Sequence, residues 1–446
     1  MLITNANLIT WGAENKILHG YSIYIKGDKI ADIAPDPELA ARYPNENRVD
    51  ARGQYVMPGN ICGHTHFYGA FARGMAIPGE APKDFPQILD KLWWNLDKAL
   101  LEEDVRSSAL VCLVDAIKHG TTTLIDHHAS PSFIDGSLDV VADAVTKSGL
   151  RASLCYEVTD RDGEVKMQAG VQENVRFIKR LQAQKESRLA ASFGLHASLT
   201  LSESTLYYCR ESIPEGSGFH IHAAEGLADQ DDSLAKSGLR VMDRLEKHGI
   251  LGPQSIAVHA VHVDAREIQI LADTGTWVTH QPRSNMNNAV GVAPVESMLR
   301  AGVKVGLGND GFSNTMWDEW KAAYLLHKSA NGDPRRMGGY DVKEMAIENN
   351  AALAKVFFPE APLAEISVGA FADLIFVDYH PFTDMNAGNL PWHILFGFNE
   401  SMVTTTIVGG EILMKDRELL TLDEEEIAAK AREASADAWK RYEALA

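Results

Sequence analysis

The sequence predicts an α/β protein: a (β/α)8 TIM barrel accompanied by a small β-sandwich domain that both chain ends form. Two observations favour this fold. Eight short apolar runs alternate with helical or loop stretches between residues 56 and 359, and strand-like texture returns after about residue 360. Strands that alternate with helices indicate a parallel sheet, and eight such units over roughly 250–300 residues are typical of a closed barrel. An open doubly wound sheet is the alternative, but no glycine-rich phosphate loop follows the first strand.

Both chain ends have β character. In residues 1–55, two apolar segments flank Gly27-Asp28, and after residue 360 two more flank Gly409-Gly410; both dipeptides are hairpin signals. The N-terminal piece is too small to bury much surface alone. We therefore expect residues 1–55 and 360–446 to form one composite β-sandwich beside a barrel of residues 56–359. The stretch 423–446, rich in Ala, Glu and Lys, predicts a solvated terminal helix.

The barrel elements follow from hydrophobic periodicity. We expect strands at residues 56–63, 121–127, 151–158, 189–197, 218–224, 255–261, 276–281 and 303–308. We expect helices at residues 102–119, 137–148, 165–183, 239–248, 264–274 and 316–330.

Composition narrows the function classes. The formal net charge of −19 argues against nucleic acid or an anionic membrane surface as a partner. The sequence has no apolar run long enough to span a membrane and does not open like a signal peptide. The 4 cysteines lie far apart and form no Cys-x-x-Cys pair, which is typical of a reducing compartment. We expect a cytoplasmic protein that acts on a small molecule, either as a monomer or as a homo-oligomer.

Most of the 16 histidines lie at ends of the expected strands, and strand ends converge on the face where barrel enzymes hold their active sites. His64 and His66, at positions i and i+2, point to one side of their strand. His222 and Asp310 end the fifth and eighth strands, and the glycines around Asp310 indicate a close backbone approach. Three imidazoles and a carboxylate, without thiolates, suit one catalytic Zn²⁺, with Fe²⁺ as the alternative.

Two further residues accompany this ligand set. Glu225, three residues after His222, suits a proton shuttle, and His259, after the sixth strand, suits a group that orients water or binds an oxyanion. Arg73, shortly after the histidine pair, is expected to contact substrate, with an ion pair as the alternative. His220 is expected to face the surrounding helices.

Taken together, these motifs resemble the amidohydrolase superfamily, in its branch of guanine deaminase and atrazine chlorohydrolase. Residues 283–288 resemble the SsnA-type aminohydrolases within that branch. The resemblance covers nearly the whole chain. It rests on Pro58-Gly59, His64-x-His66, His222-x-x-Glu225, His259, the run 280–285 and Gly308-Asn309-Asp310-Gly311.

The resemblance implies particular roles. His64, His66, His222 and Asp310 would bind one metal ion, Glu225 and His259 would be catalytic together with Asp310, and His196 would contact substrate. No lysine ends the fourth strand, which reads Gly194-Leu195-His196, so the carbamate bridge of two-metal members is not expected. Asn309 stands where the branch usually has Thr; it points away from the metal, and we expect little effect.

The sequence thus predicts a cyclic amidine deaminase, a metal-dependent aminohydrolase in which metal-bound hydroxide attacks an amino-bearing carbon of a purine, pterin or similar ring. Displacement of a ring halide and opening of a cyclic amide are the alternatives among hydrolases. A metal-binding barrel without catalysis is the alternative outside them, although such a module has no need of Glu225.

Overall fold

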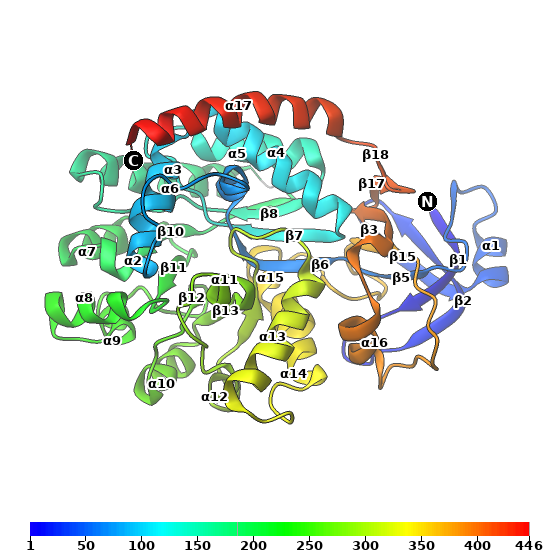
Figure 1. Cartoon of the computed structure of the whole chain (residues 1–446). Coiled ribbons are helices and arrows are strands. Elements are labelled where there is room, and N and C mark those ends of the chain that lie inside the picture. The colour runs from blue at the N-terminus through cyan, green and yellow to red at the C-terminus, as the bar shows by residue number, and fades with distance from the viewer. Residues whose placement is uncertain (185, 446) are drawn as a thin grey trace.

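The computed structural model describes residues 1–184 and 186–445. It has two parts: a barrel of parallel strands wrapped by helices, and a sheet at one side in which both chain ends meet (Figure 1). A continuous cluster of buried apolar side chains fills the layer between barrel strands and helices, and includes Leu113, Val141 and Phe177.

The barrel strands form two parallel runs, β6-β7-β8-β9 and β10-β11-β12-β13-β14. A parallel bridge between Val158 and Leu195 joins the runs at one seam, and a bridge between Thr65 and Asp310 joins them at the other. The predicted (β/α)8 fold is confirmed, with the expected strand 189–197 divided at Ser192. The strands are β6 (Asn60–Thr65), β7 (Thr121–Asp126), β8 (Arg151–Leu154), β9 (Leu189–Ala191), β10 (Phe193–Ala197), β11 (Phe219–Ala223), β12 (Ile256–His259), β13 (Trp277–His280) and β14 (Val305–Leu307).

The expected strand 56–63 is also divided. Its first half, β5 (Tyr55–Pro58), pairs with strands of the end sheet, whereas β6 begins the barrel. The division falls at Gly59, where a Cβ atom would lie 2.2 Å from Thr122 Cγ2. The absence of a side chain therefore lets the chain pass from one sheet to the other against β7.

The six predicted barrel helices are present, with ends within two residues of those expected. They are α4 (Glu102–Lys118), α5 (Ser137–Ser148), α6 (Glu164–Ala183), α9 (Val241–Lys247), α10 (Ala265–Thr274) and α13 (Met316–Asn331). The structure adds α2 (Phe85–Ile88), η2 (Leu89–Trp93), α3 (Trp94–Ala99), α7 (Glu203–Ser212), α8 (Leu227–Ser237), α11 (Pro282–Asn287), α12 (Val295–Arg300), α14 (Gly339–Lys343), η4 (Glu344–Asn349), α15 (Asn350–Phe357) and α16 (Leu390–Gly397). Within the described residues, no helix has both the length and the apolar composition needed to cross a membrane.

Strands from both chain ends join in one nine-stranded sheet. Ile3, Ile23 and Phe376 pack in its own apolar cluster. The two hairpins predicted at Gly27-Asp28 and Gly409-Gly410 are present, and both glycines of the second have positive φ, as tight hairpin turns require. The division of the chain at residues 55 and 360 into domains stays a prediction. The strands are β1 (Leu2–Ile9), β2 (Ile17–Lys26), β3 (Lys29–Pro35), β4 (Arg48–Asp50), β5, β15 (Leu374–Val377), β16 (Val403–Val408), β17 (Glu411–Lys415) and β18 (Glu418–Leu419), and α1 (Asp36–Arg42) follows β3.

The terminal helix α17 (Glu424–Leu445) runs across the barrel over α4 (Figure 1). It is not solvated all round as expected, because Ala438 and Tyr442 on one face are fully buried. Trp439 Nε1 donates to Phe71 O at 2.8 Å, and Tyr442 Oη donates to Lys91 O at 2.7 Å. The helix therefore fixes the segments 67–72 and 89–93. Ala446, the last residue of the expected helix, lies outside the described residues.

Gly308 allows the close approach at the seam between β14 and β6, because a Cβ atom there would lie 2.7 Å from His64 N and O. We predict that Gly308→Ala lowers the stability of the protein by about 1–3 kcal/mol, as overpacking does. The measurement is the midpoint of urea unfolding. The control is Gly252→Ala, where a Cβ would meet nothing within 4 Å. Equal midpoints for the two variants would contradict the assigned role.

Candidate active site

Four side chains from three strand ends converge at the mouth of the barrel. His66 Nε2 lies 3.1 Å from His222 Nε2 and 3.0 Å from Asp310 Oδ1, and His64 Nε2 lies 3.6 Å from the same Asp310 oxygen. All four potential ligand atoms lie within 4.8 Å of one another. The structure thus brings together the full ligand set expected from the sequence.

Each of the three imidazole rings is held through its other nitrogen. His66 Nδ1 donates to His127 O at 2.5 Å, and His222 Nδ1 donates to His196 O at 2.8 Å. A ring that donates through Nδ1 presents a lone pair at Nε2 when it is neutral. The two facing Nε2 atoms would then repel each other unless a cation lay between them.

His220 holds the third ring, His64. The Cys155 thiol donates to Asp126 O at 3.5 Å, so its sulfur accepts from His220 Nδ1 at 3.7 Å. His220 Nε2 therefore accepts from His64 Nδ1 at 2.9 Å. Among the described residues, the buried His64 Nε2 has no hydrogen-bond partner. An unpaired lone pair aimed at two other ligand atoms fits a bound metal ion.

The expectation that His220 faces the helices was wrong. His220 and His222 stand at positions i and i+2 of β11 and so share one face of the strand. Both rings therefore point into the barrel, with His220 one layer below His222. The same alternation that placed His64 and His66 together predicts this arrangement.

The two expected catalytic residues lie beside the ligand cluster. Glu225 Oε2 lies 3.3 Å from His259 Nε2, which in turn lies 3.8 Å from Asp310 Oδ2. Burial, reinforced by the negative charge of Asp310, raises the pKa of Glu225 well above its ordinary range. His259, Asp310 and Ala224, which precedes Glu225, all have left-handed backbone conformations. Strain of this kind gathers at functional sites.

One short helix positions three of these side chains. Asp310 Oδ2 accepts from Ser284 Oγ at 2.5 Å, His259 Nδ1 donates to Asn285 Oδ1 at 2.8 Å, and Asn288 Nδ2 donates to Glu225 Oε1 at 3.3 Å. Ser284 and Asn285 lie in α11, and Asn288 is its C-cap. The run 283–288, which in the sequence carried only a family resemblance, is therefore the support of the site.

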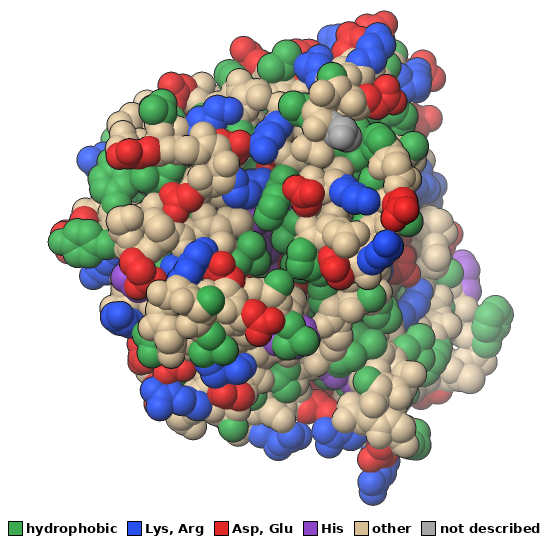
Figure 2. Space-filling view, turned by 60° about the vertical axis from the view of Figure 1, so that its left-hand side comes forward, with side chains coloured by type: hydrophobic (Ala, Val, Ile, Leu, Met, Phe, Trp, Pro, Cys, Tyr) green, Lys and Arg blue, Asp and Glu red, His purple; other side chains and the backbone are tan. Residues whose placement is uncertain are grey.

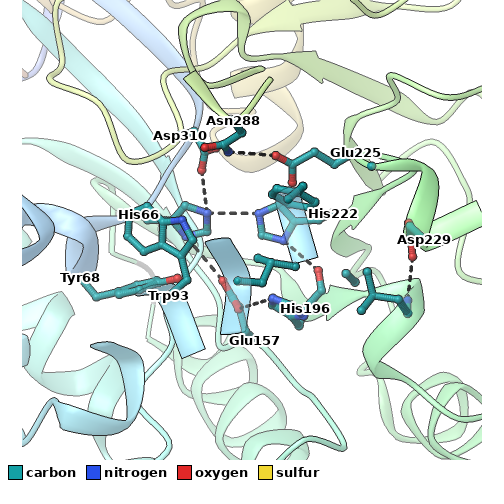
Figure 3. A pocket seen from close by; sticks show the side chains of 15 residues that line it. His66, Tyr68, Trp93, Glu157, His196, His222, Glu225, Asp229, Asn288 and Asp310 are labelled. Atoms are coloured by element: carbon teal, nitrogen blue, oxygen red, sulfur yellow. Dashed lines mark hydrogen bonds and ion pairs between the residues drawn. The ribbon is translucent and has the colours of Figure 1, made fainter. Parts of the chain in front are cut away.

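A pocket opens above the cluster (Figure 3). Histidine side chains are visible at the bottom of a hollow that hydrophobic side chains flank (Figure 2). His196 lies in the pocket wall, as expected for a substrate contact. Sequence analysis did not identify Glu157, Tyr68 or Trp93 as pocket residues. The signal for Glu157 was a carboxylate near the end of the expected strand 151–158. The lining residues are His66, Tyr68, Phe85, Leu89, Trp93, Glu157, His196, Ala197, Leu199, His222, Glu225, Gly226, Asp229, Asn288 and Asp310.

The structure does not bring Arg73 to this pocket. The 3-10 turn η1 (Phe67–Ala72) carries it to an exposed position, where it lines a separate hollow with Asp115 of α4 and with His119, the C-cap of that helix. Arg73 is therefore corrected from a pocket residue to a surface residue.

The known proteins that this chain resembles in sequence and in fold are consistent with one family. The sequence model of the amidohydrolase family matches residues 55–413. The 5'-deoxyadenosine deaminase of Methanosarcina acetivorans is 33% identical over 440 residues, covering 98% of this chain and 97% of its own. The 5-methylthioadenosine/S-adenosylhomocysteine deaminase of Pelotomaculum thermopropionicum is 30% identical over 439 residues, covering 97% of each chain. The fold matches a zinc-bound adenosine deaminase from Xanthomonas campestris with a TM-score of 0.85 and 22% identity over 98% of both chains.

His220 provides a test of the ligand support. We predict that His220→Phe, which removes the acceptor for His64 Nδ1, weakens metal binding by about 10–100-fold, the usual effect of losing such an outer partner. Zinc titration against a competing chelator measures this. His380→Phe, at a side chain that is 87% exposed, is the control. A zinc affinity equal to that of the control would contradict the assigned role.

Proposed function

This chain belongs to the amidohydrolase family, and we propose that it is a metal-dependent hydrolase of carbon–nitrogen bonds that deaminates an amino-substituted nitrogen heterocycle. The observation that carries the proposal is the position of Glu225 and His259 directly beside a cluster of three histidines and Asp310. The relatives are named as deaminases of adenosine derivatives, which supports an amino-bearing purine-like ring as the substrate class.

The ion that we propose is Zn²⁺, held by His64, His66, His222 and Asp310. Imidazole and carboxylate ligands suit zinc, and a catalytic site of this kind keeps a position open for water. When bound, the ion supplies Lewis acidity and lowers the pKa of a coordinated water toward about 7.

The side chains of the chain divide the proton transfers. Asp310 takes a proton from the attacking water and passes it to the departing amino group. Glu225 passes a proton to the ring nitrogen next to the reacting carbon and regains one from the new hydroxyl group. His259 donates through Nδ1 to Asn285, so its neutral ring presents the Nε2 lone pair, and burial lowers the pKa of the ring below its ordinary value. This Nε2 atom accepts a hydrogen bond from the water and orients it. Water replaces the amino group, which leaves as ammonia while a ring carbonyl forms.

The proposal is tested by measuring ammonia release from a panel of adenosine derivatives, aminopurines, pterins and aminopyrimidines. We expect release from at least one ring, with loss of release after chelation and recovery with zinc. A zinc-loaded protein that releases no ammonia from any of these rings would overturn the deaminase proposal.

The role of Glu225 is tested by Glu225→Gln. We predict that kcat falls by at least about 100-fold, the scale of a lost proton-transfer group, whereas the zinc content stays unchanged. Steady-state kinetics and elemental analysis measure these two quantities. Glu211→Gln, at an exposed position of α7, is the matched control. Loss of zinc from the variant, or a rate near that of the control, would contradict the role.

A further inference from the structure

The pocket wall contains a buried carboxylate, Glu157, which the deamination steps above do not use. It follows β8 and is only 2% exposed. His127 Nδ1 lies 3.0 Å from Glu157 Oε1. The proton between them lies either on Glu157 Oε1 or on His127 Nδ1. In both cases the second carboxylate oxygen of Glu157, Oε2, carries no hydrogen and acts as an acceptor. Among the described residues, no donor forms a hydrogen bond with Oε2, and Glu157 lines the pocket, so this oxygen is available to a donor on a bound molecule.

A second acceptor stands beside it. Thr200 Oγ1 donates to Ala197 O at 3.1 Å, so the same oxygen accepts from His196 Nδ1 at 2.8 Å. The neutral His196 ring then presents the lone pair of Nε2, which lies 3.8 Å from Glu157 Oε2. The pocket wall therefore offers two neighbouring acceptors that do not bind each other.

Glu157 and Glu225 lie at different positions in the pocket wall. Figure 3 shows Glu225 and Glu157 on opposite sides of the His66–His222 pair. Glu157 Oε1 lies 3.5 Å from His66 Nδ1, so a single imidazole ring separates it from the proposed ion. At that depth Glu157 faces the edge of the reacting ring and not a distant substituent.

We propose that Glu157 and His196 select rings in which the amino-bearing carbon is flanked by a ring N–H, as in guanines, pterins and isocytosines. This inference rests on the proposed deamination. The amino group and the ring N–H would face the two acceptors, while the ring nitrogen on the other side of the reacting carbon would face Glu225. In adenine derivatives the amino-bearing carbon has no N–H neighbour. A sugar diol could also supply paired donors, so the test includes it.

The first test measures binding and needs no turnover. Hypoxanthine and 1-methylhypoxanthine lack an amino group and differ only at N1, where the second carries a methyl group in place of the hydrogen. With zinc-loaded wild-type protein, calorimetry is expected to show at least about 100-fold tighter binding of hypoxanthine, because a site built to bond a donor rejects the analogue that lacks it. Equal affinities would overturn the inference. A clear preference would support the inference even if no ring releases ammonia, so the two proposals fail separately.

The second test measures turnover of guanine and 1-methylguanine by Glu157→Gln, in which the amide group can turn a donor toward the pocket. We expect the kcat/KM preference for guanine to shrink by at least about tenfold, with unchanged zinc content. Glu173→Gln is the control, since Glu173 is equally buried at 2% exposure but holds the start of α5. An unchanged preference would overturn the inference. A wild-type preference for adenosine that disappears with 2',3'-dideoxyadenosine would also overturn it, by assigning the acceptors to the sugar.

Discussion

The site depends on one constraint: three imidazole rings are fixed through Nδ1, so that their Nε2 lone pairs meet. Two of the partners are backbone carbonyls, of His127 and His196, and the third is His220. Backbone partners cannot rotate away, and His220 is fully buried. When both rings are neutral, the lone pairs of His66 Nε2 and His222 Nε2 face each other at 3.1 Å, which is unfavourable unless a proton or a metal ion lies between them. The fold therefore favours a positive charge at this point. Glu225, His259 and the pocket wall are arranged around it.

The barrel brings these side chains together by placing distant segments of the chain side by side. The seam between β6 and β14 places Asp310 beside the histidine pair, and His66 N donates to Asp310 O at 3.1 Å across it. The terminal helix α17 holds the segments that contribute Tyr68 and Trp93 to the pocket wall. Residues from the first barrel strand, the last barrel strand and the terminal helix therefore set the geometry of the site.

Much of this arrangement was predictable from sequence, because a strand end is a local feature. His64, His66, His222 and Asp310 follow apolar runs directly, and barrel topology then brings them to one face. His220 was misassigned although the alternation along β11 places its ring inside the barrel. The other failures concern contacts that local patterns do not encode. Arg73 is close to His66 in sequence, but the intervening turn η1 carries it to the surface. The supporting roles of Ser284, Asn285 and Asn288 depend on how α11 faces β14. The role of Glu157 follows only from the imidazole rings that surround it in the folded structure.

The most direct test of the central claim is the position of the ion itself, measured by anomalous diffraction at the zinc edge from crystals of the zinc-loaded protein. The account predicts one strong peak within bonding reach of Nε2 of His64, His66 and His222 and of one Asp310 oxygen, at about 2.0–2.2 Å. A principal peak bound elsewhere, for example at Cys155 and His127, or an ion held through the Nδ1 atoms of the three rings, would contradict it.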